Sequence, residues 1–359
     1  MPIEAKHLSA TIGPAASRSE AVAFRAALRR WFRSHQRDLP WRKTTDPYAI
    51  LVSEFMLQQT QVAAVLPYYS EWTRRFPDFA SLAAAPESEV LHAWQGLGYY
   101  ARARNLHAAA KAVVHQYGGA LPRNAHAIRD LPGVGRYTAN AIATFAFGDS
   151  VPIVEANISR LLARLINLRE PIDTGAGQAT LWKTAASLLP SRGAAVHNSA
   201  LMDLGATVCI SRRPRCPICP VQEFCQAADP TAIPIKKAIP GLKMLTEAHA
   251  FRRRKASVLL EKSEKRWRGM WILPRLADAP GRRPLYRSSF PFTNHRITLT
   301  IFACAEDPGP PAARQRWFKL TTLESIPMPS PHRRALRQML AAEEAQSFAK
   351  QRPHPSLIR

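Results

Sequence analysis

Four of the five cysteines in the 359-residue chain lie within seventeen residues, with the spacing Cys209-x6-Cys216-x2-Cys219-x5-Cys225. Four neighbouring thiolates can hold a tetrahedral zinc ion or an iron–sulfur cluster. Zinc sites usually contain two short cysteine pairs and this segment contains one, so the spacing mildly favours a cluster and leaves zinc open. The fifth cysteine, Cys304, is expected to be a buried core residue.

A glycine-rich turn, Leu131-Pro-Gly-Val-Gly-Arg136, separates two segments with helical patterning. Gly133 and Gly135 permit a tight turn and a close approach to the backbone. The helix that follows points its N-terminal amides toward the turn, which is an arrangement that suits a phosphate group. A plain glycine-rich connection between helices is an equally weighted alternative.

Acidic, amide and aromatic side chains occur in two further segments, residues 53–60 and 96–106. Taken individually, Glu54 is a carboxylate on a helix face and is usually solvated. Gln59 is an ordinary helix-surface residue, and Tyr99 is most often a core or surface aromatic. These residues indicate a chemistry only through the order of the motifs along the chain.

The chain is strongly basic, with 50 Lys and Arg against 26 Asp and Glu and a formal charge of +24. This charge favours a polyanionic partner, of which nucleic acid is the common one. An anionic membrane and a generally basic composition are alternatives that charge alone does not exclude. No apolar run is long enough to span a membrane, and the first residues lack a secretory pattern, so we expect a cytoplasmic protein of bacterial type.

The hydrophobic pattern changes character along the chain. Phe24, Leu28, Trp31 and Phe32 recur at helical spacing, whereas residues 297–301 alternate between apolar and polar as in a half-buried strand. Proline and lysine gather between these two regions, which indicates a linker. We therefore expect a loose N-terminus, an all-helical domain, a linker, a smaller α+β domain and a polar tail, at residues 1–18, 19–227, 228–248, 249–345 and 346–359.

Residues 28–225 resemble the MutY-type adenine DNA glycosylases of the helix-hairpin-helix, endonuclease III superfamily, because several separate motifs occur in the family's order. The resemblance implies a multi-domain protein. An all-α helix-hairpin-helix glycosylase domain would contain a [4Fe–4S] cluster loop, and a smaller α+β Nudix-like domain would follow. Cys209, Cys216, Cys219 and Cys225 match the ligands of the cluster, which is structural in this family and faces DNA.

The resemblance also assigns catalytic roles. Glu54 matches the acid that protonates N7 of adenine, and burial lets a carboxyl group hold its proton near neutral pH. Glu155 matches the carboxylate that stabilises charge on the sugar. Tyr137 and Asn157 match groups that support this carboxylate. Tyr137 replaces the lysine that cleaves the strand in endonuclease III-type members, so no strong lyase activity is expected.

Further positions match groups that contact DNA in this family. Trp41 and Arg42 match part of the adenine pocket. Gln59 matches the residue that inserts into the duplex where the adenine leaves, and Tyr99 matches an aromatic residue that intercalates beside 8-oxoguanine. In the second domain, residues 266–274 resemble the turn and strand of the family's Nudix-like domain. This chain contains no nucleotide-hydrolase motif there, so nucleotide pyrophosphatase activity is not expected. The lesion-reading loop corresponds to residues 292–296, with His295 and either Asn294 or Thr293 as its reading side chains.

The chain departs from the family at its catalytic carboxylate, where Glu155 replaces Asp and Ala156 replaces Gly. The added methylene moves the carboxylate by roughly 1–1.5 Å, and such a displacement can cost on the order of a hundredfold in rate. Asp149 is a possible substitute outside the motif. We expect an active enzyme that uses Glu155, and a slow, degenerate protein that binds the lesion without processing it is the alternative.

The function implied is excision of adenine paired with 8-oxoguanine or guanine in double-stranded DNA, by a monomer with a [4Fe–4S] cluster. One alternative is a glycosylase for thymine or uracil mismatches, since relatives share the scaffold and the tyrosine position. The other is a protein that binds the lesion with weak catalysis, motivated by Glu155.

Overall fold

The computed structural model describes residues 17–238, 241–281, 283–304 and 311–351, so most of the predicted N-terminal segment and the last eight residues of the predicted tail lie outside the described residues. The chain forms two compact units. Unit 1 comprises residues 1–59, 75–80 and 108–239, and unit 2 comprises residues 60–74, 81–107 and 240–359.

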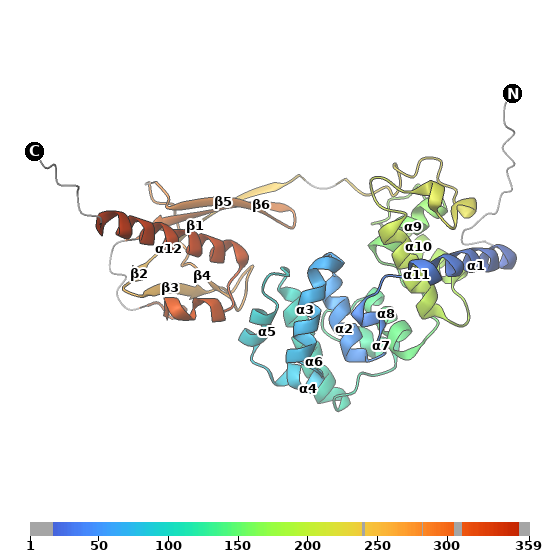
Figure 1. Ribbon diagram of the computed structural model, residues 1–359, viewed down its shortest axis with the longest axis horizontal. Coiled ribbons are helices and arrows are strands. Elements are labelled where there is room, and N and C mark those ends of the chain that lie inside the picture. Colours follow the sequence, from blue (N-terminus) through green and yellow to red (C-terminus); the bar gives the residue numbers. More distant parts are fainter. Residues whose placement is uncertain (1–16, 239–240, 282, 305–310, 352–359) are drawn as a thin grey trace, which may run out of the picture. The chain divides into compact units, whose positions relative to one another are not determined.

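The described chain up to Thr207 is helical (Figure 1). The helix α1 begins after Ser17, whose side chain accepts from the backbone of Glu20 while the Glu20 carboxylate accepts from the backbone of Ser17. Helix α1 covers Arg18–His35. The helices that follow are α2 (Pro47–Leu57), α3 (Val62–Arg75), α4 (Phe79–Ala84), α5 (Glu87–Ala93), α6 (Ala101–Tyr117), α7 (Ala125–Arg129), α8 (Arg136–Phe147), α9 (Ala156–Leu165), α10 (Gly175–Leu188) and α11 (Ala194–Thr207).

The main core of unit 1 lies between α1, α9, α10 and α11. Helix α1 buries Phe24 and Leu28 at helical spacing, as the sequence pattern predicts. Helix α9 is amphipathic and buries Leu161, Leu162 and Leu165 on the same side of the unit. Burial of each such side chain stabilises the fold by roughly 1.5–3 kcal/mol, so this core fixes the start of α9 and the residues placed there.

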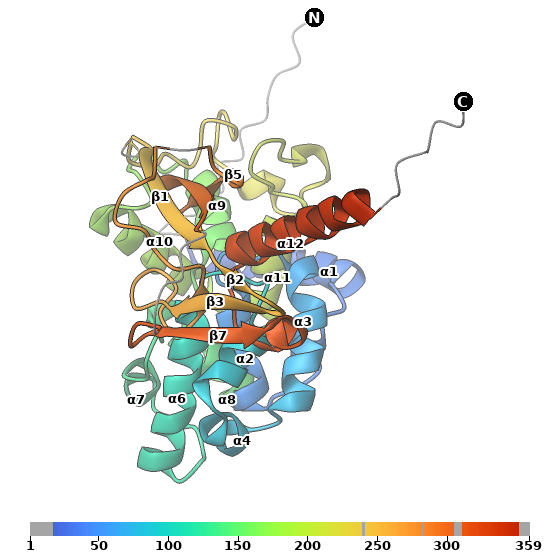
Figure 2. The same ribbon diagram turned by 90° about the vertical axis from the view of Figure 1, so that its left-hand side faces the viewer.

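Unit 2 contains two small sheets. In the first sheet, β6 lies between β1 and β5, with β1 parallel and β5 antiparallel to it. In the second, β3 pairs antiparallel with β2, β4 and β7. Helix α12 lies between the two sheets in both views (Figures 1 and 2). The elements are β1 (Lys243–Phe251), β2 (Arg253–Arg254), β3 (Ser257–Lys262), β4 (Trp271–Ile272), β5 (Tyr286–Phe292), β6 (His295–Ala303), β7 (Gln315–Lys319) and α12 (Ser330–Gln351).

The helical region followed by an α/β region with sheets confirms the coarse fold prediction. The alternating residues Ile297, Leu299 and Ile301 are all buried on β6. One difference concerns the predicted linker, because β1 already begins at Lys243. The first four residues of β1 are exposed, although they pair with β6, so this part of the strand has no alternation between a buried and an exposed face. Helix α12 continues to Gln351, past residue 345.

No helix within the described residues is long and apolar enough to cross a membrane.

Candidate active site

Glu54 lies on α2, which is buried along nearly its whole length. Asp46 caps the helix by accepting hydrogen bonds from the backbone of Tyr48 and Ala49, and Pro47 occupies the first turn. The Glu54 side chain is therefore carried into the interior of unit 1, where the residue is only 5% exposed. Burial raises the pKa of its carboxyl group to about 7, with a hydrogen bond from Tyr137 opposing the shift and the charge of Glu155 adding to it.

Tyr137 occupies the first turn of α8, directly after the glycine-rich turn. Its hydroxyl group is hydrogen-bonded to Glu54, and burial together with the charges of Glu54 and Glu155 raises its pKa well above the usual value. Tyr137 therefore stays neutral, and its hydroxyl group donates a hydrogen bond to the Glu54 carboxyl group. The structure thus brings together three of the predicted catalytic residues, from three separate segments of the chain.

Glu155 is the N-cap of α9. Its carboxylate accepts hydrogen bonds from the backbone of Asn157 at 2.7 Å and of Ile158 at 2.8 Å. Burial raises the pKa of Glu155, while these two amides, Arg160 and Arg37 act in the opposite direction. The longer side chain thus reaches the two amides that a short N-cap residue reaches, so the helix start accommodates Glu in place of Asp. A polar cavity of about 660 Å³ borders Glu155, with Arg160, Asp173 and Lys236 also in its lining.

Asn157 lies on the first turn of α9 and packs closely on α11, where a Cβ atom at Gly205 would lie 2.8 Å from the Asn157 side chain. Its side-chain oxygen accepts from Arg160 at 2.8 Å. Arg160 also donates to the carbonyl oxygens of Gly205 at 2.7 Å and Cys209 at 2.9 Å. The helix start that carries Glu155 is therefore linked by Arg160 to the first cysteine of the quartet.

Trp41 and Arg42 lie in a short 3-10 helix, Pro40–Arg42, and Trp41 is buried. The Arg42 guanidinium forms two hydrogen bonds with the buried carboxylate of Asp203, at 2.7 and 2.8 Å. Arg37 donates to the same carboxylate at 2.6 Å through its side chain. These contacts hold the pKa of Asp203 below its usual value despite burial. Arg42 is thus fixed in place by an ion pair with α11.

The glycine-rich turn joins α7 to α8 and forms a helix–hairpin–helix. Gly133 adopts a φ of 78°, which favours glycine, and the backbone of Val134 donates to Leu131 at 3.0 Å. Gly135 is the N-cap of α8 without a side-chain cap, and a Cβ atom there would meet nothing within 4 Å. Internal packing does not require glycine at this position, whereas an external group that approaches the amides of α8 would.

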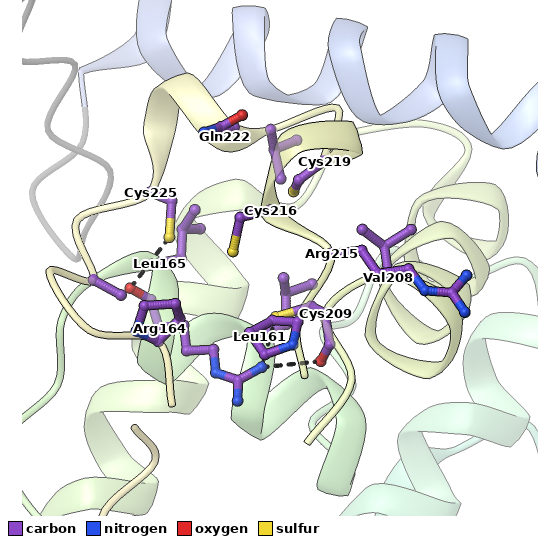
Figure 3. Close-up of a pocket in the computed structure, with 14 residues that line it drawn as sticks. Leu161, Arg164, Leu165, Val208, Cys209, Arg215, Cys216, Cys219, Gln222 and Cys225 are labelled. Atoms are coloured by element: carbon purple, nitrogen blue, oxygen red, sulfur yellow. Dashed lines mark hydrogen bonds between the residues drawn. The ribbon is translucent and has the colours of Figure 1, made fainter. Parts of the chain in front are cut away.

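The cysteine quartet lines a cavity of about 280 Å³ between α9 and the loop that follows α11. Figure 3 shows the four cysteine side chains around this cavity, with Arg164 beside Cys209 and Cys225. The loop between Cys209 and Cys225 is built from two short 3-10 helices, Cys216–Ile218 and Gln222–Phe224. Within the described part of the chain, no three His, Cys, Asp or Glu side chains are arranged to hold a single metal ion.

Arg164 anchors this loop from α9 and is only 1% exposed. Its guanidinium donates to the carbonyl oxygens of Ile233 at 2.9 Å, Ile210 at 2.8 Å and Ser211 at 2.7 Å. It also contacts the carbonyl oxygen and the sulfur of Cys209, at 3.2 and 3.3 Å. A buried cation beside the thiols suits a group that carries net negative charge through its thiolates. The four thiols, the cavity and this cation fit a four-cysteine cluster.

Three residues predicted to contact DNA have a positive φ, which non-glycine residues rarely adopt. These are Gln59 at 56°, Tyr99 at 48° and Thr293 at 51°, and within the described residues only Asn167 and Lys255 share this feature among non-glycines. Tyr99 is 44% exposed, although it is a large aromatic. Gln59 follows the C-cap of α2 in unit 1, and Tyr99 and Thr293 lie in unit 2.

The predicted lesion-reading loop is a tight β-hairpin between β5 and β6. Phe292 pairs with His295, so Thr293 and Asn294 form the two-residue turn. The guanidinium of Arg266 lies 5.0 Å from the centre of the Phe292 ring. Thr293 and Asn294 are exposed at the tip, and His295 is half-buried at its base.

The charged residues that hold the site together were not predicted from the sequence. Asp203 and Arg164 are buried and Arg160 is half-buried, and the pattern around Asp203 gives no sign that its side chain points inward. A weak signal existed for α9, because Arg160 and Arg164 are one helical turn apart and Arg164 interrupts a run of leucines.

Residues 52–186 match the family described as "HhH-GPD superfamily base excision DNA repair protein". The chain is 44% identical over 219 residues to human adenine DNA glycosylase, a match that covers 58% of this chain and 40% of the human protein. It is 45% identical over 192 residues to adenine DNA glycosylase of Mycolicibacterium smegmatis, covering 53% of this chain and 65% of that protein. Each match thus spans less than two thirds of the relative.

Among solved structures, a thermostable thymine-DNA glycosylase is 33% identical to the chain and superposes with a TM-score of 0.54. The superposition covers 57% of this chain and 95% of that protein. The likeness therefore includes nearly the whole of the solved glycosylase.

Proposed function

The chain belongs to the HhH-GPD superfamily of base excision DNA repair proteins, and on this premise we propose that it excises adenine paired with 8-oxoguanine or guanine in double-stranded DNA. The observation that carries the proposal is the buried carboxyl group of Glu54, whose pKa is raised to about 7 and which accepts a hydrogen bond from Tyr137. Such a group holds a transferable proton at neutral pH in a position shielded from water.

The reaction requires an adenine outside the base stack. The protonated Glu54 donates to N7 of the flipped adenine, so the base leaves without developing full negative charge. Tyr137 keeps the carboxyl group oriented, and because it donates to the charged form it also limits how far burial raises the pKa of Glu54.

As the bond between base and sugar breaks, positive charge develops on the sugar. The Glu155 carboxylate stabilises this charge, or bonds briefly to the sugar carbon before water completes the hydrolysis. Its two backbone amide donors and nearby Arg160 and Arg37 favour the ionised form that this role requires. Asn157 and Arg160 hold the start of α9 in place around it.

The products are free adenine and an unbroken strand with an abasic site. Strand cleavage requires an amine nucleophile, and Tyr137 occupies the position at which the related lyases carry lysine. We therefore assign a monofunctional glycosylase, and we propose, as the family resemblance implies, that it acts as a monomer.

We also propose that Cys209, Cys216, Cys219 and Cys225 bind a [4Fe–4S] cluster. The cluster supplies structural order when bound and takes no part in base excision. Its loop exposes Arg212, Arg213 and Arg215, which would contact DNA phosphates. The amides around Gly133 and Gly135 would bind a phosphate group of the strand from which the adenine is removed.

The α/β region is proposed to have a Nudix-like fold and to read the base opposite the adenine. The hairpin tip at Thr293 and Asn294, with His295 beside it, is the candidate reading element. Gln59 and Tyr99 would enter the duplex on the two strands. Their exposed positions and positive φ values support this role.

A thymine or uracil mismatch glycosylase is the second candidate, supported by the 33% identity to a thymine-DNA glycosylase. Adenine is favoured because a protonated carboxyl group near its ring can assist its departure, and because the relatives at 44 and 45% identity are named for adenine. A lesion-binding protein with weak catalysis is the third possibility, and it depends on whether Glu155 is productive.

A panel of four duplexes tests these candidates, with adenine opposite 8-oxoguanine, adenine opposite guanine, and thymine or uracil opposite guanine. Single-turnover and multiple-turnover rates would be measured with the released base identified by mass. We expect adenine release from the first two duplexes only. Release of thymine or uracil at a higher rate would favour the second candidate, and tight binding without release would favour the third.

A further inference from the structure

Tyr99 is carried by a turn whose backbone is held on several sides. Gly96 and Gly98 have φ values of 111° and 72°, and Tyr99 follows with 48°. The indole nitrogen of Trp94 and the guanidinium of Arg102 both donate to the carbonyl oxygen of Gly98, each at 3.1 Å. The turn is therefore a fixed element that presents an exposed aromatic ring, rather than a loose loop.

Gln95 precedes this turn and is fixed through both its backbone and its side chain. Its backbone carbonyl oxygen accepts from the hydroxyl group of Tyr68 at 3.0 Å. Its side-chain oxygen accepts from Arg333 at 3.0 Å and from the backbone of Met328 at 3.4 Å. Arg333 lies on α12, in the same unit as the turn. A residue of the C-terminal region therefore holds Gln95, the residue directly before the turn that carries Tyr99.

The position of Arg333 is itself closely determined, because the residue is only 7% exposed. The same guanidinium donates to the carbonyl oxygens of Leu323 at 3.0 Å and Ile326 at 2.7 Å, and to the Glu324 carboxylate at 2.9 Å. Its two terminal nitrogens thus connect a single segment, residues 323–326, to Gln95. A planar guanidinium with several directed donors is a rigid connector, which a lysine ammonium would not reproduce.

A second contact supports the same arrangement. The imidazole Nε2 of His92 lies 2.9 Å from the carbonyl oxygen of Glu324. Arg104, on α6 just beyond the turn, donates to the carbonyl oxygen of Arg268 at 3.0 Å. The segment on each side of Tyr99 is therefore attached to the C-terminal region.

We propose that Arg333 is a positioning residue for Tyr99, and that through Gln95 it makes the choice of opposite base depend on α12. The inference rests on the proposed function, in which Tyr99 contacts the base opposite adenine. Arg333 touches no substrate in this account, and it acts by fixing the origin of the turn. Its loss is expected to lower the preference for 8-oxoguanine over guanine on the order of tenfold.

The experiment measures the ratio of single-turnover excision rates for adenine opposite 8-oxoguanine and opposite guanine. The variants are Arg333→Gln and Gln95→Leu, each made with Tyr99 intact and with Tyr99→Ala. Arg337→Gln is the matched control, because Arg337 lies one turn further along α12, pairs with the same Glu324 and is exposed. If Arg333→Gln fails to fold, Gln95→Leu removes the same contact without deleting the buried charge.

With Tyr99 intact, we expect both variants to lower the ratio about tenfold and the control to leave it unchanged. In the Tyr99→Ala background, the same variants should cause no further change, an epistasis that general destabilisation would not produce. An unchanged ratio, or an equal fall in both backgrounds, would overturn the inference alone. Absence of adenine release by the unmodified protein would instead refute the proposed function, and this inference with it.

Discussion

The hydroxyl group of Tyr137 is hydrogen-bonded to the carboxyl group of Glu54, although the two residues come from different helices and different sequence motifs. Burial alone would push the pKa of Glu54 upward, and the hydrogen bond opposes that shift because it stabilises the charged form. The resulting value of about 7 leaves the acid substantially protonated at neutral pH and also able to release its proton. The pair therefore sets the proton supply of the proposed reaction.

The pH dependence of excision follows from this pKa. Glu54 carries its proton below about pH 7 and loses it above, so the active form declines as pH rises. We expect the single-turnover rate to be level on the acidic side and to fall about tenfold per pH unit well above pH 7. Rapid-quench measurements from pH 5.5 to about 9 would check this. A rate that stays level through that range would exclude Glu54 as the proton donor.

Removal of the hydroxyl group in Tyr137→Phe is expected to move the basic limb of this profile to higher pH. The hydrogen bond lowers the pKa of Glu54, so its loss should raise that pKa. Tyr48→Phe is the matched control, because Tyr48 lies on α2 with Glu54 and its hydroxyl group donates to the backbone carbonyl oxygen of Phe76. A limb that moves to lower pH, or moves equally in both variants, would contradict the assignment.

Glu155 tests whether the departure from Asp is productive. Glu155→Gln keeps a capping oxygen but removes the charge, so we expect excision to fall by about 10² to 10³. Glu155→Asp keeps the charge and a short capping carboxylate, and it should retain measurable excision. The exposed Glu170→Gln serves as a control for the loss of one negative charge. Equal activity of Glu155→Gln and the unmodified protein would place the carboxylate elsewhere, with Asp149 the next residue to test.

The cysteine quartet predicts four iron and four sulfide per chain in protein purified without oxygen. Cys216→Ser should lower both contents and the thermal stability, because a ligand of a loop-organising cluster is lost. Cys304→Ser should change neither content, since Cys304 lies in the other unit. Stoichiometric zinc in place of iron and sulfide would return the site to the alternative that the spacing leaves open.

The sequence made the motif residues recognisable, but it did not reveal how they are held. Glu54, Tyr137 and Glu155 each occur in a short sequence motif, and such a motif can be recognised without knowing the fold. The pairing of Arg42 with Asp203 joins residues far apart in the chain, and nothing in either neighbourhood indicates it. The burial of Arg164 was equally unpredictable, because the apolar pattern of α9 is the same whether the arginine side chain points into the core or into solvent.

The strands show the same distinction in the fold. The alternation in β6 was recognisable because one set of its side chains is buried. The first half of β1 was not, because it is exposed on both faces and exists through its hydrogen bonds to β6. Such a strand depends on a partner about fifty residues away, which composition does not encode.

The role of Glu54 as proton donor is tested by comparing the unmodified protein with Glu54→Gln on a duplex with adenine opposite 8-oxoguanine. Free adenine would be quantified, and the strand would be scored before and after alkali. If Glu54 protonates the departing base, we expect one adenine released per bound duplex, strand breaks only after alkali, and a rate about 10² to 10⁴ lower for Glu54→Gln at neutral pH. Equal rates for the two proteins would exclude Glu54 as the proton donor, and breaks without alkali would exclude a monofunctional glycosylase.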